Sequence, residues 1–199
     1  MRVHRSHGVC RNRQDPVGGC LWFGVDDANT AVFLPMYCSI TEVPESYRQG
    51  KGDLYNFDFD AAFWVNNLVA NQAYHRYSQM IPDIRKVQGE IEDKCANDQP
   101  AIESRALELL KTNRDEAIQY LTNYSVNTAQ NATARYQDLA KYLFVKYLDG
   151  NRKKEKDGKF LRNEYGMPAQ PDFPGYTQDY YNQFGIPSCD HLKEVEPEK

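Results

Sequence analysis

Two short apolar runs near the N-terminus predict a β-hairpin. From residue 17 the chain reads VGGCLWFGVDDANTAVFLPM, in which the polar letters DDAN separate the runs. The runs are rich in aromatic and β-branched residues, so we expect strands over 20–25 and 30–34. Pro35 would end the second strand because proline has no N–H to donate. Both strands are apolar on both faces, which indicates a hairpin covered on each side. Residues 4–11 are compatible with a further strand.

A change of period beyond the hairpin predicts helices. The segment 37–57 has no sustained period and is expected to be a loop. After it, apolar residues recur at steps of three and four, and Asp58 or Asp60 is the expected N-cap of an amphipathic helix. Pro82 falls where a second helix would have its first turn, so we expect a break near Ile81.

Further helices are expected up to residue 149. Pro100 starts a new apolar stripe, and Thr112 followed by Asp115 resembles a capping box. One apolar face then continues over 117–147, which predicts a helix of about nine turns. A polar row beside this face is interpreted as a solvated surface more readily than as a binding surface. The row consists of Asn123, Asn127 and Asn131.

The end of the chain has a different composition. Half of the ten prolines fall within 168–197, and regular structure is expected to stop there. The segment has too many aromatic rings for a solvated linker, so we expect it to pack on the body through its rings, with frayed last residues. The predicted division is a body of residues 1–149, with the hairpin at about 20–34 and helices at about 59–149, and an extended Pro- and Tyr-rich tail of residues 150–199.

Charge and composition narrow the possible functions. The 24 basic and 28 acidic side chains give a net charge of −4, whereas a nucleic-acid-binding protein is normally basic, so no nucleic-acid partner is expected. No run approaches about 18 consecutive apolar residues, so no membrane span is predicted. The start of the chain lacks the apolar core of a signal peptide. As it stands the chain would be cytoplasmic, and the compartment of a longer protein stays open.

The cysteines and histidines predict neither a metal site nor a cofactor. The five cysteines are an odd number without a CxxC pair, and the four histidines have no partners at metal spacing. We expect free, mostly buried thiols. The chain contains no GxSxG, HExxH, P-loop or GxGxxG motif. Asp26 and Asp27 would point to opposite faces of a strand, so a role in turn hydrogen bonds is preferred over an acid–base pair.

Several strings in the first half of the chain carry a resemblance to a known family. WFGVDD, FLPMY, TEVP and AFWVNN follow one another in this order within residues 18–93. Together they resemble the C-terminal part of the dipeptidase A family of cysteine peptidases, which belongs to the N-terminal-nucleophile hydrolases and is related to the secernins. The similarity covers roughly residues 3–93 and extends more loosely to residue 149. One departure is Ala28, where family members commonly carry proline after the acidic pair.

The resemblance implies an α+β fold, the C-terminal portion of a four-layer αββα architecture. The hairpin would belong to a sheet, and the helices after Asp60 would pack outside it. The family's nucleophile is a cysteine at the mature N-terminus, whose own α-amino group acts as the general base. Here Met1 is followed by Arg2, and every cysteine lies within the chain. No catalytic residue is therefore assigned, and the chain is expected to be inactive alone.

The resemblance also suggests substrate-binding residues for a complete enzyme. The loop 37–47 leaves the end of a predicted buried strand, and loops on rigid scaffolds concentrate ligand contacts. We expect Tyr37 to form a wall of a dipeptide cleft, Thr41 to be a further contact, and Glu42 or Asp27 to be available to a substrate ammonium. A purely structural crossover is an equally good interpretation of this loop.

Two functions remain open from the sequence. The first is hydrolysis of dipeptides with an unblocked N-terminus by a complete enzyme, in which this chain supplies structural layers and pocket walls. The alternative is a noncatalytic helical interaction module left from a truncated enzyme. The expected partners are the missing N-terminal catalytic portion or a second copy of the chain, because large apolar faces are rarely left uncovered in a monomer.

Overall fold

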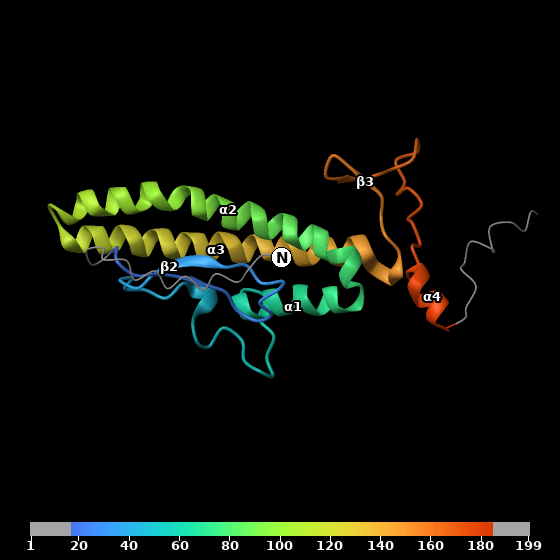
Figure 1. Ribbon diagram of the computed structural model, residues 1–199, viewed down its shortest axis with the longest axis horizontal. Coiled ribbons are helices and arrows are strands. Elements are labelled where there is room, and N and C mark those ends of the chain that lie inside the picture. Colours follow the sequence, from blue (N-terminus) through green and yellow to red (C-terminus); the bar gives the residue numbers. More distant parts are fainter. Residues whose placement is uncertain (1–16, 185–199) are drawn as a thin grey trace, which may run out of the picture. The chain divides into compact units, whose positions relative to one another are not determined.

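The computed structural model describes residues 17–184, and the chain divides into two compact units, Met1–Leu143 and Phe144–Lys199. In the first unit, a β-hairpin and a shorter helix lie on one side of two long antiparallel helices (Figure 1). The predicted α+β class is confirmed. The elements of this unit are β1 (Cys20–Phe23), β2 (Leu34–Tyr37), the 3-10 helix η1 (Glu45–Tyr47), α1 (Ala62–His75), α2 (Tyr77–Leu110) and α3 (Arg114–Tyr147), which continues into the second unit.

The hairpin forms as predicted, but its second strand comes later in the chain. β1 and β2 are antiparallel, and Trp22 lies opposite Pro35, so this proline is inside the strand rather than beyond its end. The predicted strand over 30–34 is wrong because Thr30 and Ala31 donate their N–H groups to the Asp27 carbonyl, which folds this stretch into a turn. The strand proposed for residues 4–11 lies outside the described residues.

One face of β1 is more exposed than the sequence predicted. Leu21 is 43% and Phe23 is 41% exposed, while their neighbours Cys20 and Trp22 are half-buried. This alternation is typical of a strand with one face on the core and one toward solvent. The expectation of a hairpin covered on both faces is therefore wrong for β1 in this chain.

The predicted break between the first two helices lies earlier than expected. Arg76 leaves the helical region with φ −151° and ψ 57°, and it separates α1 from α2. Its N–H donates to the Ala73 carbonyl, and its own carbonyl accepts from Gln79 and Met80. The break near Ile81 was wrong because α2 continues through Pro82 near its start and Pro100 farther along.

The start of α3 is capped by a residue that the sequence pattern did not single out. Asn113 Oδ1 accepts from the N–H groups of Asp115 at 3.0 Å and Glu116 at 3.3 Å. The predicted capping box at Thr112 is wrong, because its hydroxyl donates backwards to the Leu109 carbonyl at 3.0 Å. The helix spans 34 residues, which confirms the long helix predicted from its apolar face.

The core of the first unit lies between the long helices and the elements beside them. Val17, Tyr37, Ala106 and Leu121 form one buried cluster that joins β2 to both helices. α1 contributes further buried residues, namely Val65, Val69, Ala70 and Ala73. The polar row of α3 faces solvent, as the solvated-surface interpretation expects; it consists of Asn123, Asn127 and Asn131. No helix within residues 17–184 is both long and apolar enough to cross a membrane.

The second unit is small and mostly exposed. After α3 it contains the 3-10 helix η2 (Leu148–Gly150), a two-residue hairpin of β3 (Glu155–Lys156) and β4 (Lys159–Phe160), and α4 (Gln178–Phe184). The expectation that regular structure stops in this segment was therefore wrong. Stacked rings stabilise α4 locally, with centroids of Tyr176 and Tyr180 4.3 Å apart. The packing of the tail on the body stays a prediction.

Candidate functional site

The acidic turn, residues 26–33, is organised first by its own carboxylate. Asp27 Oδ1 accepts from the Asn29 N–H at 3.1 Å, and Oδ2 accepts from the Thr30 hydroxyl at 3.0 Å. Asp26 adopts φ 70°, a left-handed conformation that few residues other than glycine occupy. Its carboxylate is exposed and accepts from Asn67 Nδ2 of α1 at 3.0 Å. The predicted turn role of both aspartates agrees with these bonds.

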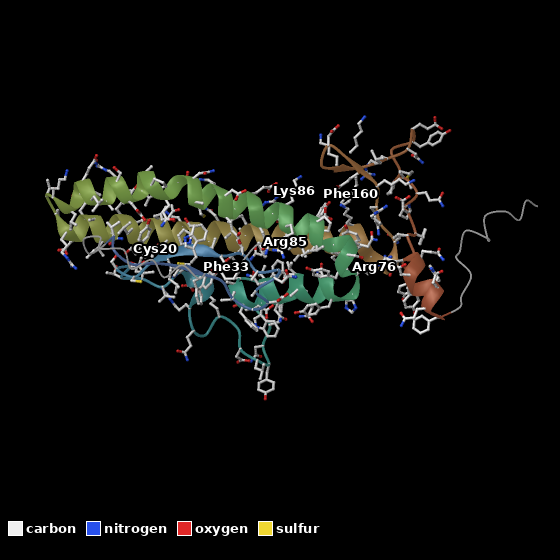
Figure 2. The ribbon with its side chains drawn as sticks, viewed as in Figure 1. Cys20, Phe33, Arg76, Arg85, Lys86 and Phe160 are labelled. Carbon is white, nitrogen blue, oxygen red and sulfur yellow. The ribbon has the colours of Figure 1, made fainter. Side chains whose placement is uncertain are left out.

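A polar face of α2 holds the main chain of the acidic turn. Gln88 is 2% exposed, and its Nε2 donates to the carbonyls of Ala31 at 2.7 Å and Asn29 at 3.2 Å. Arg85 donates to the Asn29 side-chain oxygen and, at 3.1 Å, to Gln88 Oε1. These residues meet because positions three apart share a helix face. Figure 2 labels Arg85 on α2 and Phe33 in the hairpin connection beside it.

Two further side chains complete this network. Glu92 Oε1 accepts from the Phe33 N–H at 3.1 Å, one helical turn beyond Gln88. From α3, the Tyr136 hydroxyl donates to the Thr30 carbonyl at 2.9 Å. Burial raises the pKa of Tyr136 well above its usual value, and the charge of Glu92 raises it further. The phenol therefore stays neutral and keeps its proton for the carbonyl.

Tyr37 lies in the core rather than at a surface of this chain. It is 1% exposed, and its ring meets Tyr124 edge-on with centroids 6.2 Å apart. Its N–H donates to Ser125 Oγ of α3 at 3.4 Å. The position fixes the start of the exit loop, residues 38–47, against α3. A role for Tyr37 as a cleft wall in a complete enzyme stays a prediction.

The exit loop is attached to α3 through hydroxyl groups. Thr122 Oγ1 accepts from the Thr41 N–H at 3.2 Å and donates to the Ile118 carbonyl at 2.9 Å. Farther along, Thr133 Oγ1 donates to Ser46 Oγ at 2.9 Å. Within this loop, Thr41 and Glu42 are exposed. They are the two predicted site residues that the structure leaves accessible in this loop.

Thr41 and the acidic turn contact α3 at well separated positions. On α3, Tyr136 contacts the acidic turn and Thr122 contacts Thr41. These helix positions are fourteen residues apart, which corresponds to about 21 Å along the axis. An extended dipeptide spans only about 7 Å. This separation applies to Thr41 and not to the end of the exit loop, because Ser46 contacts Thr133, three residues before Tyr136. The roles of Asp27 and Glu42 as alternative ammonium acceptors stay predictions.

The described cysteines differ in exposure: Cys95 is buried, Cys20 is half-buried and Cys38 is exposed, so the expectation of mostly buried thiols is confirmed only for Cys95. Cys20, Cys38 and Cys95 are free. Burial raises the pKa of Cys20 to about 12, with a smaller contribution from Cys38, and burial also raises the pKa of Cys95. A thiol with a raised pKa is a poor nucleophile at neutral pH, because the thiolate is the reactive form. Within residues 17–184, no group of three or more His, Cys, Asp or Glu side chains is placed to hold a metal ion.

The residues that organise the acidic turn were missed by the sequence analysis. Gln88 lies one turn after Ile84, on the apolar stripe of α2, and a polar residue on such a stripe is a signal that was available. Tyr136 was assigned to the apolar face of α3, but its carbonyl partner is 106 residues away in the sequence. No local pattern predicts a contact of that separation.

Comparison with known proteins agrees with the first half of this structure. Residues 5–90 match the model of peptidase family C69. The match includes the hairpin, the exit loop, α1 and the start of α2 with Arg85 and Gln88. The comparison with curated proteins gives no match. The matched range nearly coincides with the residues 3–93 that carry the resemblance to the dipeptidase A family, so the predicted resemblance is confirmed, and the match supports a C-terminal part of a family C69 peptidase.

Proposed function

We propose that the chain is the C-terminal portion of a cysteine-type dipeptidase and that it hydrolyses no dipeptide by itself. The family match supports a peptidase function. The proposal that the chain alone is inactive rests on the positions of the described thiols. An N-terminal-nucleophile mechanism needs a thiol next to a free α-amine, and Cys20, Cys38 and Cys95 all lie within peptide bonds.

The geometry of each thiol supports this assignment. Cys20 is in β1 with a pKa of about 12, and Cys95 is in the middle of α2 with a raised pKa. Cys38 is exposed, but its backbone nitrogen is an amide that donates to the Gly19 carbonyl at 2.9 Å. None of the three has a free α-amino group beside its thiol.

The proposed contribution of this chain to the complete enzyme is a scaffold and one wall of the substrate cleft. Thr41 and Glu42 of the exit loop are exposed, and Thr122 accepts from the Thr41 N–H while its hydroxyl lies 3.5 Å from the Thr41 hydroxyl. Loops positioned by a rigid scaffold are where substrate contacts concentrate. Glu42 would accept hydrogen bonds from the substrate ammonium.

The activity test is a dipeptidase assay with two arms. The purified chain should release amino acids from dipeptides no faster than buffer. The N-terminal portion of a family C69 peptidase, supplied as a second polypeptide with its own N-terminal cysteine, should restore turnover if the two portions assemble. Cys20→Ser should change neither arm. Turnover by the chain alone that is lost in Cys20→Ser, with mass spectrometry showing a new N-terminus at that cysteine, would overturn the proposal.

The cleft assignment is tested separately in a full-length family member that carries these residues. Thr41→Ala and Glu42→Gln remove the proposed contacts, and Tyr37→Phe keeps the buried ring while removing its hydroxyl. We expect Glu42→Gln to lower kcat/KM for dipeptides by more than tenfold, about 1.4 kcal/mol of transition-state binding. If all three variants stay within about threefold, roughly 0.7 kcal/mol, the exit loop is only structural.

A further inference from the structure

Exposed hydrophobic and aromatic side chains are unevenly distributed over the first unit. Within residues 17–143, nine large side chains of this kind are exposed, and all nine precede residue 78. They therefore lie within residues 5–90, the range that matches peptidase family C69. The helical residues 78–143 leave none exposed. Single exposed apolar side chains are ordinary, but such a concentration in one part of a unit marks a contact surface.

The densest group lies in the aromatic loop, residues 52–64, which comprises the chain before α1 and the first residues of that helix. Leu54 is 78% and Tyr55 is 91% exposed, and Phe57 and Phe63 are also exposed. The ring centroid of Trp64 lies 5.5 Å from that of Phe57 and 5.5 Å from that of Phe63, so the rings form a connected row. The chain before α1 projects away from α2 and α3 (Figure 1).

The tip of the aromatic loop is held by a short hydrogen-bonded turn. Asp53 Oδ1 accepts from the N–H groups of Tyr55 at 2.7 Å and Asn56 at 2.9 Å. The Asp53 N–H donates to the Asn56 carbonyl at 3.0 Å. Hydrogen bonds from Asn56 and from the Tyr55 N–H lower the pKa of Asp53, so its carboxylate stays charged at neutral pH and keeps these bonds. Leu54 and Tyr55 are therefore presented by a fixed main chain.

The base of the aromatic loop is fixed as well. Gly52 has φ 71°, and a Cβ at this position would lie 2.7 Å from the Trp64 ring, so the close approach requires glycine. Gln137 Nε2 of α3 donates to the Phe59 carbonyl at 2.8 Å, and Lys141 Nζ lies 5.6 Å from the Phe59 ring centroid. A surface whose shape is set before binding loses little conformational freedom when it binds.

We propose that the aromatic loop is the surface through which this chain binds the N-terminal portion of a family C69 peptidase, with Leu54 and Tyr55 inserted into an apolar groove of that portion. The inference deepens the proposed function and rests on it. Parts of one domain cover each other's apolar surface, because a domain folds around a shared core. The exposed side chains lie in the family match and residues 91–143 beyond it expose none, so the covering partner is another part of the same peptidase.

The test is co-expression of the full chain, carrying an affinity tag, with the N-terminal portion of a family C69 peptidase. The loop variant combines Leu54→Ser with Tyr55→Ser. The matched control combines Tyr165→Ser with Met167→Ser, two positions that are 80% and 61% exposed in the second unit. We expect wild type and control to retain the N-terminal portion and the loop variant to retain less than about a tenth of it, because anchors of this kind carry much of an interface's binding free energy.

Two further measurements separate binding from folding. All four substituted positions are exposed, so circular dichroism and urea unfolding of the chain alone should be the same for wild type, loop variant and control. In hydroxyl-radical footprinting of the co-purified complex, Tyr55 should be modified several times more slowly than in the chain alone, while Tyr165 keeps its rate.

The possible negative results distinguish this surface from the proposed function. Equal retention by loop variant and wild type, or an unchanged Tyr55 rate in the complex, would refute the aromatic loop as the binding surface and leave the assembly of the two portions standing. If the wild-type chain retains none of the N-terminal portion, both the assembly and this surface are wrong. If sedimentation velocity shows a dimer of the chain alone that the loop variant does not form, the aromatic loop binds a second copy, and this inference fails without affecting the peptidase assignment.

Discussion

The acidic turn connects β1 to β2 and the exit loop follows β2, and the main chains of these two segments are held in different ways. In the acidic turn, the carbonyls of Asn29, Thr30 and Ala31 accept from Gln88 or Tyr136, and Glu92 accepts from the Phe33 N–H. Buried main-chain groups outside a ladder need such partners, because an unpaired one costs as much as a lost hydrogen bond. The acidic turn is therefore a fixed part of the core.

The exit loop has fewer anchors and more exposed surface. Thr41 and Ser46 each bond to a hydroxyl of α3, while Val43 between them is 53% exposed. Segments with few buried contacts open locally at a lower free energy than the core. The hairpin therefore has a rigid end, the acidic turn, and an adaptable end, the exit loop. A ligand contact is better placed at the adaptable end.

The largest effect that tests this comparison is expected from Gln88→Met. The variant keeps the volume of a buried side chain but leaves the carbonyls of Ala31 and Asn29 without their donor. Each orphaned buried group costs about 1–3 kcal/mol, so we expect a loss of about 2–3 kcal/mol in the free energy of unfolding. Urea unfolding followed by circular dichroism at 222 nm measures it.

The matched control for this variant is Gln119→Met. Gln119 is exposed on α3 and bonds only to Asn123, so its replacement should change the unfolding free energy by less than about 0.5 kcal/mol. Equal losses in the two variants would show that the acidic turn does not depend on Gln88.

A smaller effect is expected from Tyr136→Phe, and it should depend on pH. Removing the hydroxyl leaves the Thr30 carbonyl without a donor, for a loss of about 1 kcal/mol at neutral pH. In the wild type the pKa of Tyr136 is raised in the folded state. The unfolded chain therefore loses the phenol proton at a lower pH than the folded chain. The Tyr136 contribution is therefore complete below about pH 10, the usual tyrosine pKa, and is lost above it.

Urea unfolding midpoints measured between pH 8 and 11 test the pH dependence separately from the stability loss at neutral pH. The wild type should lose stability more steeply than Tyr136→Phe over the alkaline end of this range. Tyr55→Phe is the control, because Tyr55 is 91% exposed and should leave the slope unchanged. Parallel slopes for wild type and Tyr136→Phe would contradict a buried neutral phenol.

These residues also show how far the sequence predicts the structure. The length of α3 was predictable, because one apolar face continues through the whole helix and burial on one side fixes the period. The start of β2 was not, because Thr30 to Phe33 have a strand-like composition, yet Thr30 and Ala31 donate to Asp27 and form a turn. The strand propensity of this stretch is overridden because the Asp27 side chain offers the backbone a competing hydrogen-bond partner.

The candidate site was predicted less well than the fold, for a similar reason. The family resemblance is confirmed over residues 5–90, and Thr41 and Glu42 are exposed within this stretch, but their role as site residues stays a prediction. The sequence could not show that the acidic turn and Thr41 contact α3 at positions about 21 Å apart along its axis. It also could not show that Tyr37 is buried, because a strand-end tyrosine has the same local pattern in a core and at a cleft.

The smallest effect is expected from Thr122→Val, and it should be confined to the exit loop. Valine keeps the shape of the buried threonine but cannot accept from the Thr41 N–H. The expected loss in global stability is about 0.5–1 kcal/mol. The sharper readout is amide hydrogen exchange, in which the Thr41 amide should exchange faster while the Thr30 and Phe33 amides of the acidic turn keep their rates. Faster exchange at all three amides would mean that the two ends of the hairpin open as one unit, and the contrast between a rigid and an adaptable end would then be wrong.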